Sequence, residues 1–102
     1  RAAELMRDDC SSPLTLAQLS AVAGLTPSHF VRSFSRHYGM TPHAYLLDQR
    51  IRHARTLLRR GEPLAEVALA SGFADQAHFQ RQFKRRVAAT PGHYRTQLTR
   101  LG

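Results

Sequence analysis

Arginine is the most abundant charged side chain in this sequence, and the positive charge it supplies is unevenly distributed. Fifteen Lys and Arg residues face seven Asp and Glu residues, a net charge of +8. No acidic residue lies between Asp9 and Asp48, and none follows Asp75. Such a balance on a small domain indicates an acidic partner, of which nucleic acid is the first candidate. A basic surface that is merely solvated is the alternative.

Histidine could offer metal binding or general base catalysis. His29 and His78 begin the similar segments HFVRSF and HFQRQF, and His37 follows His29 two helical turns later. No carboxylate accompanies them, and the single cysteine, Cys10, excludes an internal disulfide and a cysteine-based zinc site. The acidic residues are scattered, whereas a nuclease needs them clustered. We therefore expect no metal, no cofactor and no enzymatic activity, with His29 and His78 in structural or phosphate-facing roles.

An internal repeat determines the predicted fold. Residues 16–25 (LAQLSAVAGL) match residues 64–73 (LAEVALASGF), and residues 29–34 match residues 78–83. The Thr-Pro pairs at 41–42 and 90–91, each followed by a tyrosine, continue the match. One extra residue stands in the turn of the second copy. Two copies indicate a duplicated module rather than a solenoid.

Each copy has the pattern of a helix, a glycine-containing turn and a second helix. In the first copy Thr15 and Gln18 have the capping-box spacing. Gly24 can end the first helix, and Thr26-Pro27 can begin the second, which ends at Gly39. Helical spacing predicts two buried stripes, formed in the first helix by Leu16, Leu19 and Val22 and in the second by Phe30 and Phe34.

The second copy repeats this pattern with two differences. Asp75 is the expected N-cap of its second helix. Pro63 replaces Thr15, so the capping box is absent, and Ala88 replaces Gly39, which leaves the end of that helix open. The expected buried positions are Leu64, Val67 and Ala70 in the first helix and Phe79 and Phe83 in the second.

A long helix is predicted between the copies, from Thr41-Pro42 to Arg60, and Gly61 ends it. Its buried face is expected to contain Tyr45, Leu47, Ile51, Ala54 and Leu58. Short helices are expected over residues 2–9 and after Pro91. We therefore predict an all-α fold of about seven helices, with a first helix-turn-helix unit at 1–45, a linker helix at 42–60 and a second helix-turn-helix unit at 61–102.

The length of the linker helix favours DNA as the partner. At 1.5 Å per residue, about 19 residues span roughly 28 Å. Adding the width of the flanking helices places the second helix of one copy on the order of 34 Å from the second helix of the other. Successive major grooves on one face of B-DNA have this spacing. No apolar run reaches the roughly 20 residues that span a bilayer, so we expect no membrane partner. The single cysteine fits a reducing compartment, and we expect a cytoplasmic protein.

The chain resembles the C-terminal DNA-binding domain of the AraC/XylS family of bacterial transcription regulators. The resemblance rests on HFVRSFSRHYGMTPHAYL, RIRHARTLL and LAEVALASGFADQAHFQRQFKRRVAATPGHYR, from about Leu14 to Arg95. The family usually has Gly where Ala88 stands. The resemblance implies sequence-specific binding of double-stranded DNA in transcription regulation, with activation as the commoner role. It also implies RNA polymerase as a protein partner and a sensing or dimerisation domain outside this fragment. Nonspecific or architectural DNA binding is the alternative.

The resemblance also assigns residues that read bases. They are Ser28, Val31 and Arg32 in the first unit and Gln76, Gln80 and Arg81 in the second. Their chemistry fits, because Arg pairs with guanine, Gln with adenine and Val with the thymine methyl. Arg32 and Arg81 could instead share a salt bridge or a phosphate contact, and the glutamines could simply be solvated. We expect the second unit to read more bases than the first.

Four further basic residues are interpreted as phosphate contacts or as solvated charge. They are Arg36, Arg55, Lys84 and Arg85.

Overall fold

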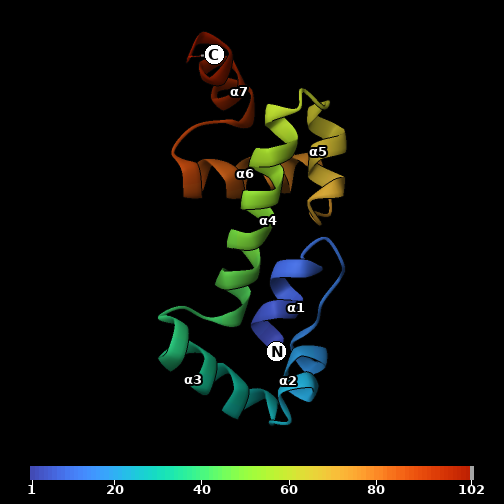
Figure 1. The fold of residues 1–102 in the computed structure, drawn as a ribbon, viewed down its shortest axis with the longest axis vertical. Helices are drawn as coiled ribbons and strands as arrows, with labels where there is room; N and C mark the ends of the chain where they lie inside the picture. Colours follow the sequence, from blue (N-terminus) through green and yellow to red (C-terminus); the bar gives the residue numbers. More distant parts are fainter. Residues whose placement is uncertain (102) are drawn as a thin grey trace. The chain divides into compact units, whose positions relative to one another are not determined.

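The computed structural model describes the backbone of residues 1–101 and the side chains of residues 1–98. In this part of the chain every regular element is a helix, which confirms the all-α prediction (Figure 1). No helix in it is long and apolar enough to cross a membrane. The seven helices are α1 (Ala2–Asp8), α2 (Leu16–Ala23), α3 (Pro27–Tyr38), α4 (Pro42–Arg59), α5 (Leu64–Ala70), α6 (Gln76–Val87) and α7 (Pro91–Leu101).

The chain forms two units, Arg1–Gln49 and Arg50–Gly102. The boundary lies inside α4, so the first half of this helix packs in the first unit and the second half in the second unit. The predicted buried face of α4 is present: Leu47, Ile51, Ala54 and Leu58 are buried and Tyr45 is half-buried. Leu46 and Leu57 are buried as well.

The core of the first unit is formed by buried side chains from one side of each of its helices. Phe30 and Phe34 from α3 pack with Met6 from α1, Leu19 from α2 and Leu46 from α4. The ring centroids of Phe30 and Phe34 lie 5.6 Å apart, and Phe34 meets Tyr45 edge-on at 5.3 Å. These aromatic contacts join α3 to the start of α4.

The second unit repeats this aromatic packing. The centroids of Phe79 and Phe83 lie 5.6 Å apart, and Phe83 meets Tyr94 edge-on at 5.4 Å. Phe73 extends the row, with its centroid 5.3 Å from that of Phe79. The sequence repeat is therefore also a repeat of side-chain packing, because equivalent rings meet at nearly the same distances.

Burial extends the repeat to a part of the chain where Arg7 and Arg55 are the one identical pair. Met6 and Cys10 are buried in the first unit, and Ala54 and Leu58 are buried at the corresponding positions of the second. The same correspondence matches α1 with the second half of α4. Each unit thus has a first helix, the two helices of the helix-turn-helix, and a closing helix that begins at Pro42 or Pro91.

The predicted buried stripes of α2 and α5 are only partly correct. Leu16 and Val22 are 43% and 40% exposed, and only Leu19 of that stripe is buried. In α5, Val67 is buried but Ala70 is exposed. The prediction was only partly correct because both helices are about two turns long. Only their middle residues reach the core, and the residues of the first and last turns extend beyond it.

The helix ends follow the predicted local rules. The capping box is present, since the Thr15 side chain accepts from the Gln18 amide while the Gln18 side chain accepts from the Thr15 amide. Gly39 ends α3 in the left-handed conformation, with φ of 74°. Ala88 ends α6 in the same conformation, with φ of 62°. A left-handed backbone costs a residue with a Cβ about 1–2 kcal/mol, so the end of α6 is strained.

We predict that Ala88→Gly raises the free energy of unfolding by about 1 kcal/mol, because glycine adopts this conformation without strain. The reciprocal change, Gly39→Ala, should lower it by a similar amount, about 1 kcal/mol. A Cβ at Gly39 would meet no atom within 4 Å, so the control isolates the backbone effect. Urea denaturation measures both changes. An unchanged midpoint for Ala88→Gly would show that the end of α6 relaxes without cost.

Candidate nucleic-acid interface

Helix α3 presents one row of polar side chains opposite its buried face. Thr26 caps the helix, its hydroxyl accepting from the His29 amide at 3.3 Å, and Pro27 is the first helical residue. Arg32 stands two residues from each of the buried Phe30 and Phe34, about half a turn away, so it lies opposite the core.

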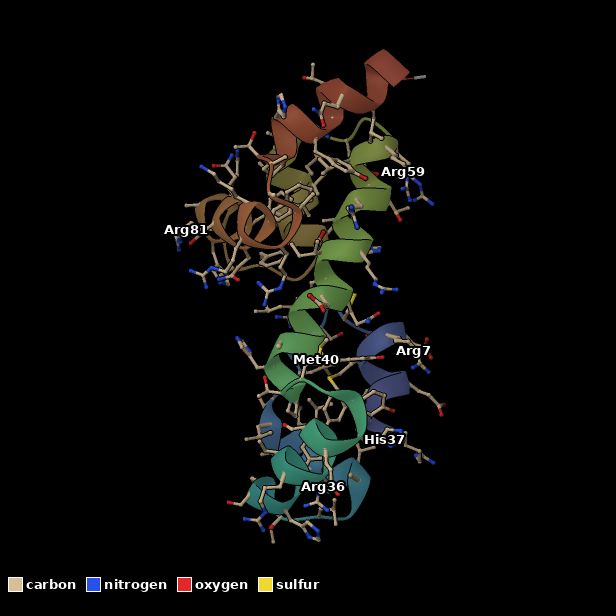
Figure 2. The ribbon with its side chains drawn as sticks, turned by 90° about the vertical axis from the view of Figure 1, so that its left-hand side faces the viewer. Arg7, Arg36, His37, Met40, Arg59 and Arg81 are labelled. Carbon is tan, nitrogen blue, oxygen red and sulfur yellow. The ribbon has the colours of Figure 1, made fainter. Side chains whose placement is uncertain are left out.

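Ser28, Arg32 and Arg36 are spaced four residues apart and are all exposed. They form one row along the outer face of α3, and Arg36 marks its C-terminal end (Figure 2). The structure thus brings two of the predicted base readers and one predicted phosphate contact onto a single face.

Val31 lies beside this row rather than on it. The residue is half-buried and lines a cleft of about 170 Å³. Leu16 lines the same cleft, so an apolar surface continues from α3 to the first turn of α2. The role of Val31 in reading bases stays a prediction.

Helix α6 presents the equivalent row. The Asp75 carboxylate caps it by accepting from the His78 amide at 2.7 Å. Arg81 stands two residues from each of the buried Phe79 and Phe83, and it projects from the side of α6 that faces away from α4 (Figure 2). Ala77 and Arg85 complete the row at the same four-residue spacing, and all three residues are exposed.

The repeat identifies Ala77 as a member of this row, although the sequence reasoning did not single it out. Ala77 is the counterpart of Ser28, whereas Gln76 is the counterpart of Pro27. Gln76 is the first residue of α6 and is half-buried. Gln80 and Lys84 form a second exposed row next to Arg81. The predicted readers of the second unit therefore lie on α6, but Gln76 stands apart from the central row.

Positive charge is concentrated near the C-terminal end of α6. Lys84, Arg85 and Arg86 lie in its last turn, where the helix dipole favours cations. Arg86 donates to the Gln82 side chain at 2.6 Å, so its head group is held against the helix. Helix α6 itself contains no acidic residue, and the Asp75 carboxylate at its start is engaged in capping. The outer face of α6 is consequently basic from Arg81 to its C-terminal end.

Arg55, a predicted phosphate contact, lies on α4 instead. Its guanidinium carbon is 5.5 Å from the centroid of the Tyr94 ring. The first unit has a contact of a different kind at the equivalent positions, in which Arg7 donates to the Tyr45 hydroxyl at 3.3 Å. That hydrogen bond, assisted by the charges of Asp8 and Glu4, raises the pKa of Arg7 above its ordinary value. An Arg–Tyr contact between the first and closing helices is thus a feature of both units.

The histidines occupy capping turns. His29 and His78 donate their backbone amides to Thr26 and Asp75, and the His78 ring meets Phe73 with centroids 5.5 Å apart. Within the described residues, no group of three or more His, Cys, Asp or Glu side chains is arranged to hold a metal ion.

Comparison with known proteins identifies relatives over most of the chain. A family model described as a helix-turn-helix domain matches residues 19–97. The HTH-type transcriptional regulator GlxA of Rhizobium meliloti is 38% identical over 94 residues, which make up 90% of this chain and 29% of that protein. The chain spans about a third of the length of the curated relatives it matches.

Solved structures show the same fold. A transcriptional regulator with an AraC-type DNA-binding domain, from Chromobacterium violaceum, is 28% identical with a TM-score of 0.87, over 94% of this chain and 87% of that one. The DNA-binding domain of AdpA, solved in complex with a target DNA, is 25% identical with a TM-score of 0.89, over 94% of this chain and 87% of that one.

We predict that Asp75→Ala lowers the free energy of unfolding by about 1 kcal/mol, because the first turn of α6 loses its side-chain cap. Asp75→Asn should leave the stability within a few tenths of a kcal/mol, since Asn caps helices as well as Asp does. Chemical denaturation of the three proteins measures the order. Equal losses in both variants would show that the carboxylate charge, rather than the cap, stabilises α6.

Proposed function

The chain belongs to the AraC-type family of helix-turn-helix transcription regulators, and on that premise we propose that it binds double-stranded DNA sequence-specifically through α3 and α6. The family consists of DNA-binding regulators rather than enzymes. One observation carries the proposal: two equivalent helices each hold an arginine directly opposite a pair of buried phenylalanines. A rigidly anchored helix with an outward arginine has the form needed to enter a major groove.

Position along the helix separates base readers from phosphate contacts. Arg32 and Arg81 stand in the middle of the outer faces, where a bidentate bond to guanine can form. Gln80 is suited to adenine beside Arg81. Val31, Ser28 and Gln76 are assigned weaker contacts, since the first is half-buried and the others stand at the helix starts. Arg36, Lys84 and Arg85 lie in later turns and are assigned to phosphates, which fix orientation rather than sequence.

We further propose that the two helices occupy successive major grooves of one duplex. Helix α4 links the two units and has 18 residues. A helix of that length spans about 27 Å, and adding the width of the flanking helices gives an expected separation on the order of 34 Å, the spacing of successive major grooves on one face.

Regulation is proposed to be activation, the commoner role in the family, which requires contact with RNA polymerase. Because the chain spans about a third of its curated relatives, a sensing or dimerisation domain is proposed for the remainder of the regulator.

Selection of bound sequences from a random duplex pool tests sequence-specific binding. We expect one enriched motif, bound at least about 10³-fold more tightly than competitor DNA at fixed salt. Recovery of an unenriched pool would instead assign the +8 charge to nonspecific or architectural binding.

Two neighbouring substitutions distinguish base contacts from phosphate contacts. Arg81→Ala should cost about 1–3 kcal/mol on the preferred site and relax the preference at one base pair. Lys84→Ala should weaken binding to all sequences alike and reduce the slope of log affinity against log salt by about one. Binding titrations at several salt concentrations measure both. An equal loss on every sequence for Arg81→Ala would place Arg81 on a phosphate.

A further inference from the structure

A second basic surface of the second unit lies on α4 and α7. An open cleft of about 510 Å³ is lined there by four residues of α4 and one of α7, namely Arg52, Arg55, Thr56, Arg59 and Tyr94. The three arginines follow one another along one side of the helix and are exposed. None of the lining residues in the described part of the chain is acidic. The cleft is therefore a concentrated positive surface.

Two of the three guanidinium groups are held in place by neighbours. Arg59 donates to the Thr56 hydroxyl at 3.4 Å, and that hydroxyl donates in turn to the Arg52 carbonyl at 3.4 Å. Arg55 stacks over the Tyr94 ring. Side chains that are already ordered lose less conformational entropy when they bind, so the cleft is partly pre-organised for a ligand.

The repeat shows which of these arginines the fold needs. Arg55 with Tyr94 corresponds to Arg7 with Tyr45, so that contact belongs to the shared architecture. In the first unit, however, the positions equivalent to Arg52 and Thr56 are the acidic residues Glu4 and Asp8, and the position of Arg59 is Ser11.

The same helix packing therefore tolerates opposite charge on this surface. Arg52 and Arg59 are not required for packing, and this leaves them available for recognition.

The Arg59 end of this cleft does not face the same way as α6, the recognition helix of this unit, that is, the helix proposed to enter a major groove. Arg59 projects from α4 on one side of the unit, and Arg81 projects from α6 on the other (Figure 2). A duplex bound along the outer face of α6 would leave the Arg59 side of α4 accessible.

We propose that this cleft binds an acidic segment of a protein partner, at the same time as α6 engages DNA. Arginine pairs with carboxylates in bidentate geometry, which matches closely spaced Asp or Glu side chains. An open, largely polar cleft suits an extended peptide better than a small molecule, because small-molecule sites are mostly apolar and enclose their ligand. Charge complementarity thus selects an acidic peptide as the occupant.

Fluorescence anisotropy with a labelled glutamate decapeptide tests the proposal on this chain without DNA. Arg52→Gln/Arg59→Gln should weaken peptide binding about fivefold, the loss expected for two exposed ion pairs. Arg1→Gln/Arg7→Gln removes the same charge from the first unit and should weaken binding less than about twofold, through long-range attraction alone. Equal losses in the two variants would overturn the proposal. Thermal unfolding verifies that both variants are folded.

A competition experiment separates a protein partner from DNA. The decapeptide should stay bound when the preferred duplex is added, and Arg52→Gln/Arg59→Gln should leave DNA affinity within about twofold at 0.15 M salt. Displacement of the peptide by the duplex, with the salt slope of DNA binding reduced by about two, would assign the cleft to phosphates and overturn the proposal. Because the peptide titration contains no DNA, it stands even if sequence-specific DNA binding fails.

Sedimentation tests a second copy of the chain as the occupant. Wild-type protein should remain monomeric at concentrations that saturate with peptide. A dimer that disappears in both Arg52→Gln/Arg59→Gln and Glu4→Gln/Asp8→Asn would place the acidic α1 of another copy in the cleft, and would overturn an external partner.

Discussion

The structure depends on one aromatic contact that occurs in both units. The last phenylalanine of the recognition helix, α3 or α6, meets edge-on the tyrosine of the closing helix, α4 or α7. Phe34 meets Tyr45 at 5.3 Å, and Phe83 meets Tyr94 at 5.4 Å. Aromatic pairs in this geometry add about 0.5–1.5 kcal/mol to the free energy gained from burial. More important here, the contact fixes the rotation of the recognition helix about its axis. The residues two positions from the phenylalanines, Arg32 and Arg81, must then face outward.

The same tyrosines connect the recognition helix to the rest of each unit. Arg7 reaches Tyr45 from α1, and Arg55 lies over Tyr94 from α4. A first helix, a recognition helix and a closing helix therefore meet at one aromatic ring in each unit. Because this arrangement uses few side chains, the surrounding surface can differ between the units. The outer face of α1 is acidic at Glu4 and Asp8, while the equivalent face of α4 is basic.

The sequence predicts those features that depend on neighbouring residues. The capping box at Thr15, the N-cap at Asp75 and the left-handed Gly39 follow from local rules, and the repeat supplies the aromatic core. Burial of Leu16 and Val22 was wrong because periodicity does not say how far a two-turn helix extends past the core. The match between α1 and α4 was missed because it consists of shared burial with a single identical pair, Arg7 and Arg55. The arginine cleft was missed because Tyr94 is far from Arg52 in the sequence.

Ala88 shows how such a duplicated fold tolerates divergence. The backbone keeps the left-handed turn that Gly39 makes in the first unit, although alanine is strained there. Packing of Phe83 against Tyr94 lies on both sides of that turn and holds it in place, so tertiary contacts override local preference. The two units therefore share a backbone set by aromatic packing, while their recognition surfaces differ. Ser28 and Val31 in one unit correspond to Ala77 and Gln80 in the other, so each unit offers a different surface to a groove from an equivalent helix.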